Sequence, residues 1–178
     1  MSDAMSDIGL PVMRWRWWRI TLTLCALCPV ACTPGRSERM ADSRLASHAF
    51  RLAPGEDLKA AIVSAVQRRG AGAACILTTV GSLSRARLRY AGVSDYDEIV
   101  GDLEIVSLVG TIGPDGAHLH IAVADSTGRT IAGHMGDGCI VRTTAEVVLG
   151  VLPDVTFRRA EDPQTGYREL VVEPATGD

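Results

Sequence analysis

Aromatic side chains are scarce in this chain, and most of the chain has no net positive charge. Only 4% of the 178 residues are aromatic, and the three tryptophans (Trp15, Trp17 and Trp18) all precede residue 20. The first 39 residues carry five basic and three acidic side chains, so the remainder carries 13 basic and 18 acidic ones, a net charge of −5. Proteins that bind nucleic acids rely on basic side chains at the phosphates and, for single strands, on aromatic platforms for the bases. The composition after residue 39 therefore argues against general nucleic-acid binding.

Long hydrophobic runs are also missing. The run Ile20–Ala31 follows an arginine-rich stretch; at about a dozen residues it is too short to span a bilayer but has the length of a signal-peptide core. It ends in the sequence PVAC, which is similar to a bacterial lipoprotein cleavage box in which Cys32 would carry the lipid, although proline stands where leucine is usual. The alternative is an over-extended start, with translation from Met40 and a cytoplasmic protein. Under either interpretation residues 1–39 are an extension outside the fold, no transmembrane segment is expected, and the folded domain spans residues 48–174.

Cysteine is limited to five residues. Cys25, Cys28 and Cys32 lie in or beside the apolar run, where their spacing would make a poor zinc site. Cys75 and Cys139 have strand-like apolar neighbours and are expected to be buried free thiols. No disulfide framework is predicted.

One segment has the period of an amphipathic helix. Glu56 and Asp57 suit the positive end of the helix dipole, and Pro54 suits its start, so the helix is expected within Pro54–Gly70. Its apolar residues recur three and four positions apart and form one stripe: Leu58, Ala61, Ile62, Ala65 and Val66.

Nearly all the rest of the domain has the pattern of strands. Gly81-Ser82 is expected to be a turn, and Ala91–Asp102 a polar loop. One helix with seven or more strands predicts an antiparallel α+β domain. The predicted strands are Phe50–Leu52, Ala74–Val80, Ala86–Tyr90, Leu103–Ile112, Ala117–Ala124, Thr130–Gly133, Cys139–Leu149, Val155–Arg158 and Arg168–Val172.

Two turns can be predicted in detail. Gly113–Gly116 and Asp125–Gly128 both end in glycine, as a type I turn followed by a bulge requires. The three strands that they join would form a meander. With a bulge at the first turn, Gly110 would face His120, and its missing side chain would leave room there.

Three of the four histidines lie in this meander. His118 and His120 are two residues apart on a strand and so share a face. A bulge at Gly128 places His134 directly opposite His120, with His118 as the diagonal neighbour. Three neutral imidazoles that converge in this way are typical of a zinc site with an open fourth position. The alternative is a solvated strand face, since a slip of one residue would turn His134 to the other side.

The chain resembles the plants and prokaryotes conserved (PPC) domain family, small bacterial and archaeal proteins whose domain also occurs in plant AT-hook nuclear proteins. The stretches that carry this resemblance run from Phe50 to about Val172: RLAPGEDLKAAI, ILTTVGSLSRARLRY, LEIVSLVGTIGPDGAHLHIAVADSTGRTIAGHM, GCIVRTTAEVVLG and DPQTGYRELVV. The resemblance implies an antiparallel α+β homotrimer, similar in fold to acetolactate decarboxylase, a zinc enzyme with three histidine ligands. It also implies that His118, His120 and His134 bind zinc or another divalent metal, as the matching histidines do in some prokaryotic relatives.

The chain departs from the plant members of this family. Plant members have a Gly-Arg-Phe-Glu-Ile stretch, where this chain has Gly101-Asp102-Leu103-Glu104-Ile105, so an acid replaces the arginine that recruits partners. No Arg-Gly-Arg core of an AT-hook occurs. The chain is therefore of the bacterial type, whose members usually bear the label of predicted DNA-binding proteins.

Three functions remain open at the level of the sequence. The first is a DNA-associated regulatory trimer, for which the alternating arginines Arg85, Arg87 and Arg89 would supply a basic stripe that binds DNA weakly. The alternative is that those arginines form a solvated strand face or pair across the subunit interface with acids of the following loop: Asp95, Asp97, Glu98 or Asp102. The second is a metal-dependent enzyme or sensor of an unidentified small molecule, built on the three histidines. The third is an interaction module without chemistry. The sequence leaves the catalytic groups unknown. Glu104 has the right face by parity but lies six residues along its strand from Gly110, roughly 20 Å away. The sequence does not place the other two candidates, Arg142 and Glu146.

Overall fold

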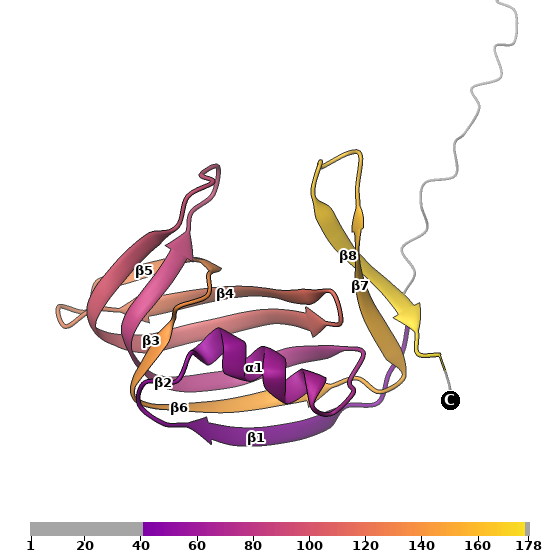
Figure 1. The fold of residues 1–178 in the computed structure, drawn as a ribbon, viewed down its shortest axis with the longest axis horizontal. Helices are drawn as coiled ribbons and strands as arrows, with labels where there is room; N and C mark the ends of the chain where they lie inside the picture. Colours follow the sequence, from indigo (N-terminus) through magenta and orange to yellow (C-terminus); the bar gives the residue numbers. More distant parts are fainter. Residues whose placement is uncertain (1–40, 177–178) are drawn as a thin grey trace, which may run out of the picture. The chain divides into compact units, whose positions relative to one another are not determined.

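The computed structural model describes residues 41–176, which form one helix and eight strands (Figure 1). The expectations for residues 1–39 lie outside these residues. Six strands form one sheet in the order β1-β6-β2-β3-β4-β5, and β7 and β8 form a separate hairpin. Every strand pairing is antiparallel, which confirms the predicted α+β class. The elements are β1 (Ala46–Leu52), α1 (Leu58–Gln67), β2 (Ala74–Arg89), β3 (Asp97–Gly113), β4 (Gly116–Ala124), β5 (Thr130–Met135), β6 (Ile140–Val151), β7 (Val155–Glu161) and β8 (Arg168–Pro174).

The helix is shorter than the sequence predicted. It begins at Leu58 because Asp57 is its N-cap: the backbone of Asp57 is extended, and its carboxylate accepts a hydrogen bond from the Ala60 N–H at 3.0 Å. Pro54 lies in the turn before this cap. The predicted apolar stripe does face the core, since all its members are buried except Ala61, which is half-buried.

Strand β2 runs through the position where a turn was predicted. Gly81 has φ +144°, and the register with β6 shifts beside it, so the strand bends there and continues to Arg89. A Cβ at Gly81 would lie 2.2 Å from the Thr144 carbonyl oxygen, which shows how closely β2 and β6 approach at the bend. The prediction of a turn was wrong because glycine permits a bulge as readily as a turn.

The predicted polar loop is also shorter, because β3 already begins at Asp97. Arg87 pairs with Glu98 across the two strands, and the Arg85 guanidinium lies 3.6 Å from the Glu98 carboxylate. Opposite charges in cross-strand positions favour pairing, so this acid-rich stretch continues the sheet.

Strand β5 closes the sheet onto the end of β2. Met135 pairs with Leu88 and His134 with Arg89, so β2, β3, β4 and β5 each pair with two others of the four. The length of β2 makes this closure, and it brings an arginine directly opposite one of the three histidines.

The β3–β4 register differs from the predicted one by one residue. Gly113 pairs directly with Gly116, so the turn between them has no bulge, and Val109 rather than Gly110 faces His120. A Cβ at Gly110 would lie 2.0 Å from the His118 carbonyl oxygen. Gly110 therefore serves the close approach of two backbones and does not provide space for the imidazoles.

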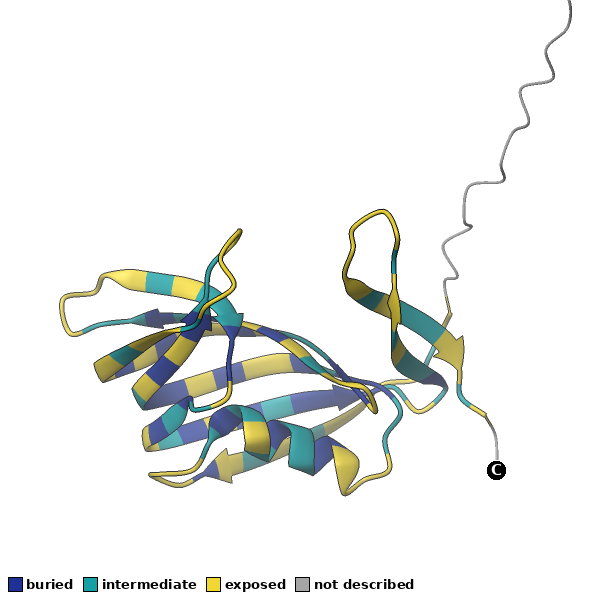
Figure 2. Cartoon of the chain, turned by 45° about the horizontal axis from the view of Figure 1, so that its top comes forward, coloured by how far each residue is buried: buried dark blue, intermediate teal, exposed yellow. Residues whose placement is uncertain are grey.

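Alternation along the strands separates a core face from an outer face (Figure 2). On β4, Leu119 and Ile121 are buried in the core that α1 also enters, while His118 and His120 are exposed on the outer face. Cys139 is a buried free thiol as expected, and Cys75 is free but only half-buried. Among the described residues, no helix is both long and apolar enough to cross a membrane.

Two hydrogen bonds hold the β7–β8 hairpin, one to the loop before β2 and one to the turn that joins β3 to β4. The Phe157 N–H donates to the Gly72 carbonyl at 3.0 Å, and the Arg159 N–H donates to the Asp115 carboxylate at 2.9 Å. These bonds place β7 and β8 beside the first residues of β4, close to His118.

Candidate metal centre

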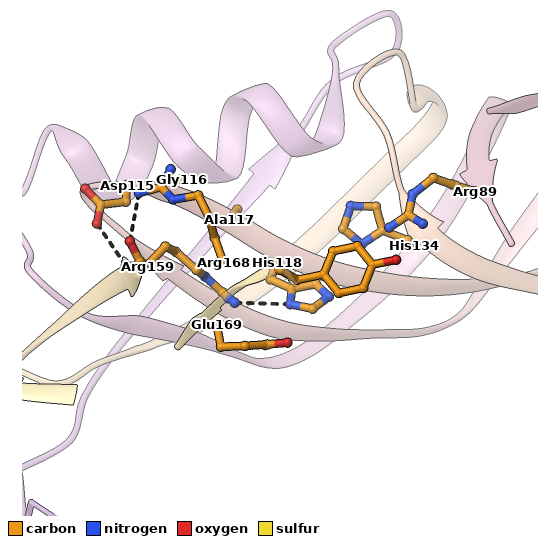
Figure 3. A pocket seen from close by; sticks show the side chains of 10 residues that line it. Arg89, Asp115, Gly116, Ala117, His118, His134, Arg159, Arg168 and Glu169 are labelled. Atoms are coloured by element: carbon orange, nitrogen blue, oxygen red, sulfur yellow. Dashed lines mark hydrogen bonds between the residues drawn. The ribbon is translucent and has the colours of Figure 1, made fainter. Parts of the chain in front are cut away.

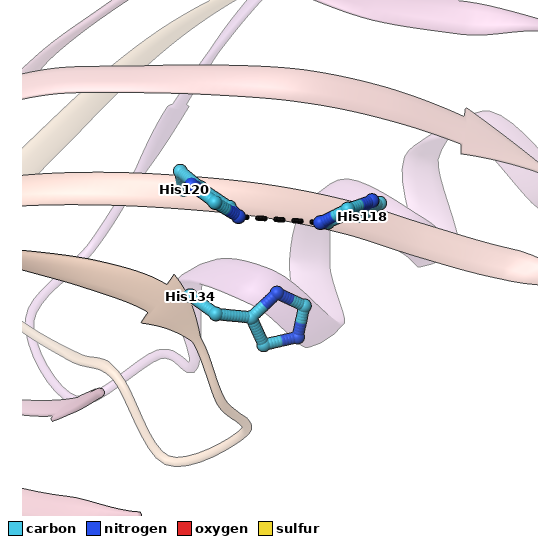
Figure 4. A group of neighbouring side chains, drawn as sticks. All are labelled: His118, His120 and His134. Atoms are coloured by element: carbon cyan, nitrogen blue, oxygen red, sulfur yellow. Dashed lines mark hydrogen bonds between the residues drawn. The ribbon is translucent and has the colours of Figure 1, made fainter. Parts of the chain in front are cut away.

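The three histidines of the meander converge on the outer face of β4 and β5 (Figure 4). His120 pairs with His134, which confirms the predicted register of these two strands. The Nε2 atoms of His118 and His120 are 3.2 Å apart, and one ring nitrogen from each of the three residues lies within 4.8 Å of the others. The cluster could therefore hold a metal ion.

The spacing and chemistry of these nitrogens fit a small tetrahedral cation. Two imidazole nitrogens that share a tetrahedral zinc at about 2.0–2.1 Å are about 3.3 Å apart, close to the separation of His118 and His120. The buried Nδ1 of His134 has no hydrogen-bond partner among the described residues. A buried polar atom without a partner is costly, and a metal ligand bond would satisfy it.

The surroundings of His118 and His134 favour the neutral form of both imidazoles. Burial, followed by the nearby His118 and Arg89, lowers the pKa of His134 from 6.5 to about 4. The pKa of His118 is also lowered, first by burial and then by Arg159 and His120. Neutral imidazoles offer a lone pair, which is the form that binds metal.

The lowered pKa of His134 predicts that the metal-free protein loses stability as the pH falls through this range. In the unfolded chain this histidine takes up a proton near pH 6.5, whereas in the fold it does so only near pH 4. The unfolded state therefore binds more protons between these values, so the free energy of unfolding decreases from pH 6.5 towards pH 4. Thermal melts of EDTA-treated protein should show a falling midpoint, with a shallower fall in His134→Gln. Equal slopes for the two proteins would contradict this assignment.

An open cavity of about 500 Å³ adjoins the histidine cluster (Figure 3). Three elements contribute to it: β2, the meander and the β7–β8 hairpin. Figure 3 places Arg89 next to His134, and it shows the Arg159 side chain reaching towards His118, with Glu169 nearby. The lining residues are Arg89, Asp115, Gly116, Ala117, His118, His134, Arg159, Tyr167, Arg168 and Glu169.

Sequence reasoning missed the contribution of the hairpin to this cavity. Arg168 and Glu169 begin a stretch that was predicted as a strand and that carries part of the family resemblance, but no local signal indicates that it folds back towards β4. A signal could have come from pairing β7 with β8, since the Asp162–Gly166 turn brings Arg159 opposite Leu170. The hairpin would then have been recognised as one unit.

The candidate partners named from the sequence lie elsewhere. Arg142 forms an ion pair with Asp102 at 2.7 Å, and neither lines the cavity. Glu146 pairs with Arg51 of β1 in register, and Glu104 lies in the middle of β3, paired with Ala124 at the other end of β4 from His118. The carboxylate that does lie beside His118 is that of Glu169.

The three alternating arginines of β2 have three different environments. Arg85 forms the ion pair with Glu98, and the Arg87 guanidinium lies 5.2 Å from the centre of the Tyr96 ring. Arg89 lines the cavity opposite His134. The stripe is thus divided between pairing with β3 and the histidine site.

The family model of the Plants and Prokaryotes Conserved (PCC) domain matches residues 39–153. Two curated relatives, each named Bifunctional protein GlmU, come from the Synechococcus strains JA-2-3B'a(2-13) and JA-3-3Ab. Each is 41% identical over 145 residues, which cover 82% of this chain and 23% of the relative. This chain therefore spans about a quarter of the length of those two proteins.

Solved structures share the fold. A hypothetical protein from Salmonella cholerae-suis is 39% identical with a TM-score of 0.76, over 78% of this chain and 100% of that one. A protein from Archaeoglobus fulgidus, named as metal-containing, is 24% identical with a TM-score of 0.66, over 75% of this chain and 99% of that one. A protein from Bacteroides thetaiotaomicron, whose name proposes DNA binding, is 18% identical with a TM-score of 0.61, over 72% of this chain and 96% of that one. For the last two, the likeness is one of fold.

Proposed function

The chain belongs to the Plants and Prokaryotes Conserved (PCC) domain family, and from this premise we propose that it is a zinc-binding member in which His118, His120 and His134 hold one ion for the binding or conversion of a small molecule. The observation that carries the proposal is the convergence of three imidazoles beside a cavity that His118 and His134 line. Three nitrogen ligands favour zinc over magnesium or calcium, which prefer oxygen. The metal-containing relative from Archaeoglobus fulgidus supports the assignment.

The chain would divide the work at such a site among its own side chains. When bound, the zinc would act as a Lewis acid towards an oxygen of the ligand. Glu169 provides the nearby carboxylate that could take up or return a proton, and Arg89 and Arg159 could orient a ligand in the cavity. This arrangement fits an enzyme or a sensor better than an interaction module without chemistry.

Metal analysis tests the proposal directly. The purified chain, stripped of metal and then dialysed against zinc, should retain about one zinc per chain through gel filtration, and a large excess of magnesium should not displace it. Protein that retains no zinc, or that exchanges it readily for magnesium, would leave the histidines as a solvated strand face and would favour the interaction module.

We also propose that the domain assembles as a homotrimer, similar in fold to acetolactate decarboxylase, as the family resemblance implies. An exposed apolar patch on the outer face of β2 and β3 supports assembly, and it consists of Leu77, Val80, Val106 and Val109. The register that joins Cys75 to Thr111 and Ser82 to Glu104 places these residues opposite one another in two pairs. Contiguous exposed apolar side chains of this kind usually mark an interface.

The trimer predicts a mass of three chains by light scattering at micromolar concentration. Val106→Asp, which places a charge in the apolar patch, should dissociate the assembly because burying an unpaired carboxylate is costly. Val93→Asp is the matched control, since Val93 is exposed in the β2–β3 loop outside the patch. Wild-type protein that elutes as a stable monomer would contradict the trimer.

For DNA we expect weak, non-specific affinity at most. The residues after 39 carry a net charge of −5. Within the stripe, Arg85 pairs with Glu98, Arg87 lies over the Tyr96 ring, and Arg89 donates to the Val93 carbonyl at 3.3 Å. Phosphate contacts supply most non-specific affinity, so a labelled duplex titrated near physiological salt should have a dissociation constant above about 1 μM. Tighter binding that falls in the triple variant Arg85→Gln, Arg87→Gln, Arg89→Gln would restore the DNA-associated function.

A further inference from the structure

The outer nitrogen of His118 has a neighbour that conflicts with metal binding. Its Nε2 faces His120 inside the cluster, while its Nδ1 lies 3.4 Å from a terminal nitrogen of Arg159. A guanidinium is always protonated and can only donate. In the metal-free protein the Nδ1 atom of His118 therefore accepts from Arg159, and Nε2 carries the proton.

Metal binding reverses this arrangement. A neutral imidazole that gives its Nε2 lone pair to a metal must carry its proton on Nδ1. Two donors, the Nδ1–H of His118 and the N–H of Arg159, then face each other with no acceptor between them. Metal-ligating histidines usually donate this proton to a carboxylate, a carbonyl or water. Among the described residues, the His118 Nδ1 atom is hydrogen-bonded to Arg159 and to no oxygen.

The charges around the cavity also call for an anion. The side chains of Arg89, Arg159 and Arg168 all line it. Among the described residues, none of these three guanidinium groups has a carboxylate oxygen within 4.0 Å, whereas those of Arg142 and Arg158, outside the cavity, do. Arg159 is held in place by its bond to the Thr111 hydroxyl at 3.1 Å, and most of its other donors are free.

The two acids of the cavity offset only part of this charge. The Asp115 carboxylate already accepts a hydrogen bond from the backbone N–H of Arg159, and it lies 3.7 Å from the guanidinium of Arg158, the preceding residue of β7. Glu169 accepts from the Thr165 hydroxyl at 3.0 Å. Three guanidinium groups against two carboxylates leave a side-chain charge of +1, to which a bound zinc would add, so the cavity favours an anion.

We propose that this cavity binds the carboxylate of a small organic acid, held between the Arg159 guanidinium and the Nδ1–H of His118, with Arg89 on the opposite side. The two donor nitrogens are 3.4 Å apart, close enough for one carboxylate to accept from the Nδ1–H with one oxygen and from the guanidinium with the other. The cavity, at about 500 Å³, has the size of a small-molecule site. The inference rests on the proposed metal centre, because zinc on Nε2 is what turns Nδ1 into a donor.

The test is the linkage between the two ligands in the full chain. Calorimetric titration with sodium lactate, acetate and inorganic phosphate at matched ionic strength should show lactate or acetate binding at least about tenfold more tightly to the zinc-loaded protein than to the metal-free protein. The same factor should appear as tighter zinc binding in the presence of the carboxylate, because coupling is reciprocal. Arg159→Gln should weaken carboxylate binding about tenfold or more without removing zinc, and Arg159→Lys should restore part of it.

Two further variants separate the cavity from general charge. Arg89→Gln should also weaken carboxylate binding, whereas Arg85→Gln, on the same strand but outside the cavity, should not. Zinc retained with no carboxylate binding, or with binding that is unchanged in Arg159→Gln, would overturn the inference and leave the metal centre intact. Phosphate binding more tightly than either carboxylate would overturn the carboxylate assignment. If zinc itself fails to bind, the metal proposal falls, and this inference falls with it because the Nδ1 atom of His118 then stays an acceptor.

Discussion

Replacing His120 with alanine is expected to abolish stoichiometric metal binding. His120 is the central residue of the cluster: its Nε2 atom lies 3.2 Å from that of His118, and its backbone pairs with that of His134. Loss of one of three protein ligands should cost more than the roughly 10–100-fold that accompanies loss of an outer hydrogen-bond partner of a ligand. Zinc content by mass spectrometry should fall from about one per chain to near zero after gel filtration. Because the side chain is exposed, the melting temperature of the metal-free protein should hardly change.

The chain offers a matched control for this experiment. His48 is the one histidine outside the cluster, half-buried on β1, so His48→Ala should retain all the zinc. Comparison within the full chain also cancels any metal bound by Cys25, Cys28 and Cys32, which are unchanged in both variants. Equal zinc in wild type and His120→Ala would mean that the metal does not bind at the histidines.

Gly110→Ala is expected to be the most destabilising glycine-to-alanine substitution in the sheet near the histidine cluster. A Cβ there would lie 2.0 Å from the His118 carbonyl oxygen, and the glycine has φ +142°. Backbone strain of about 1–3 kcal/mol adds to about 1–3 kcal/mol for bulk forced into a packed position. The free energy of unfolding should fall by about 2–6 kcal/mol in chemical denaturation, because β3 and β4 must separate where they support His118.

Gly101 provides the comparison that isolates the steric part. It lies on the same strand with φ +155°, and a Cβ there would meet no atom within 4 Å. Gly101→Ala should therefore lose only the strain contribution, and its zinc content should equal that of wild type. A fall in stability as large as that of Gly110→Ala would show that conformation alone, and not contact with β4, decides the effect.

The parts of the site that follow from local chemistry were predictable from the sequence. The β4–β5 register depends on the turn at Asp125, whose carboxylate accepts from the N–H groups of Thr127 and Arg129 at 2.9 and 3.1 Å. These bonds fix the wider turn with a bulge, and the turn in turn fixes His134 opposite His120. The two-residue spacing of His118 and His120 on β4, together with this one turn, was sufficient to predict that the three imidazoles converge.

The same reasoning failed at the β3–β4 turn for an identifiable reason. Gly113 stands where Asp125 stands in the other turn, and it has no side chain to accept from the residues that follow. The turn therefore closes over Pro114 and Asp115 alone, with Gly113 paired to Gly116. A final glycine is common to both turns, but the first residue of each decides the register.

Features that depend on contacts distant in sequence could not be predicted. The placement of Arg159 and Glu169 beside His118 requires the hairpin to pack against the β3–β4 turn, through bonds such as that from Arg159 to Asp115, 44 residues away. The pairing of Arg89 with His134 likewise requires β2 to extend past the bend at Gly81. No periodicity in either segment indicates these partners.

Val109 gives the histidine cluster a different kind of boundary on its other side. Its side chain belongs to the apolar patch, yet its backbone pairs with that of His120. A neighbouring subunit packed on this patch would exclude water from one flank of the imidazoles and lower the local dielectric constant, which strengthens the electrostatic interactions within the cluster. Solutes would then reach the imidazoles only through the arginine-lined opening, so that assembly of the subunits would decide which molecules have access and from which direction.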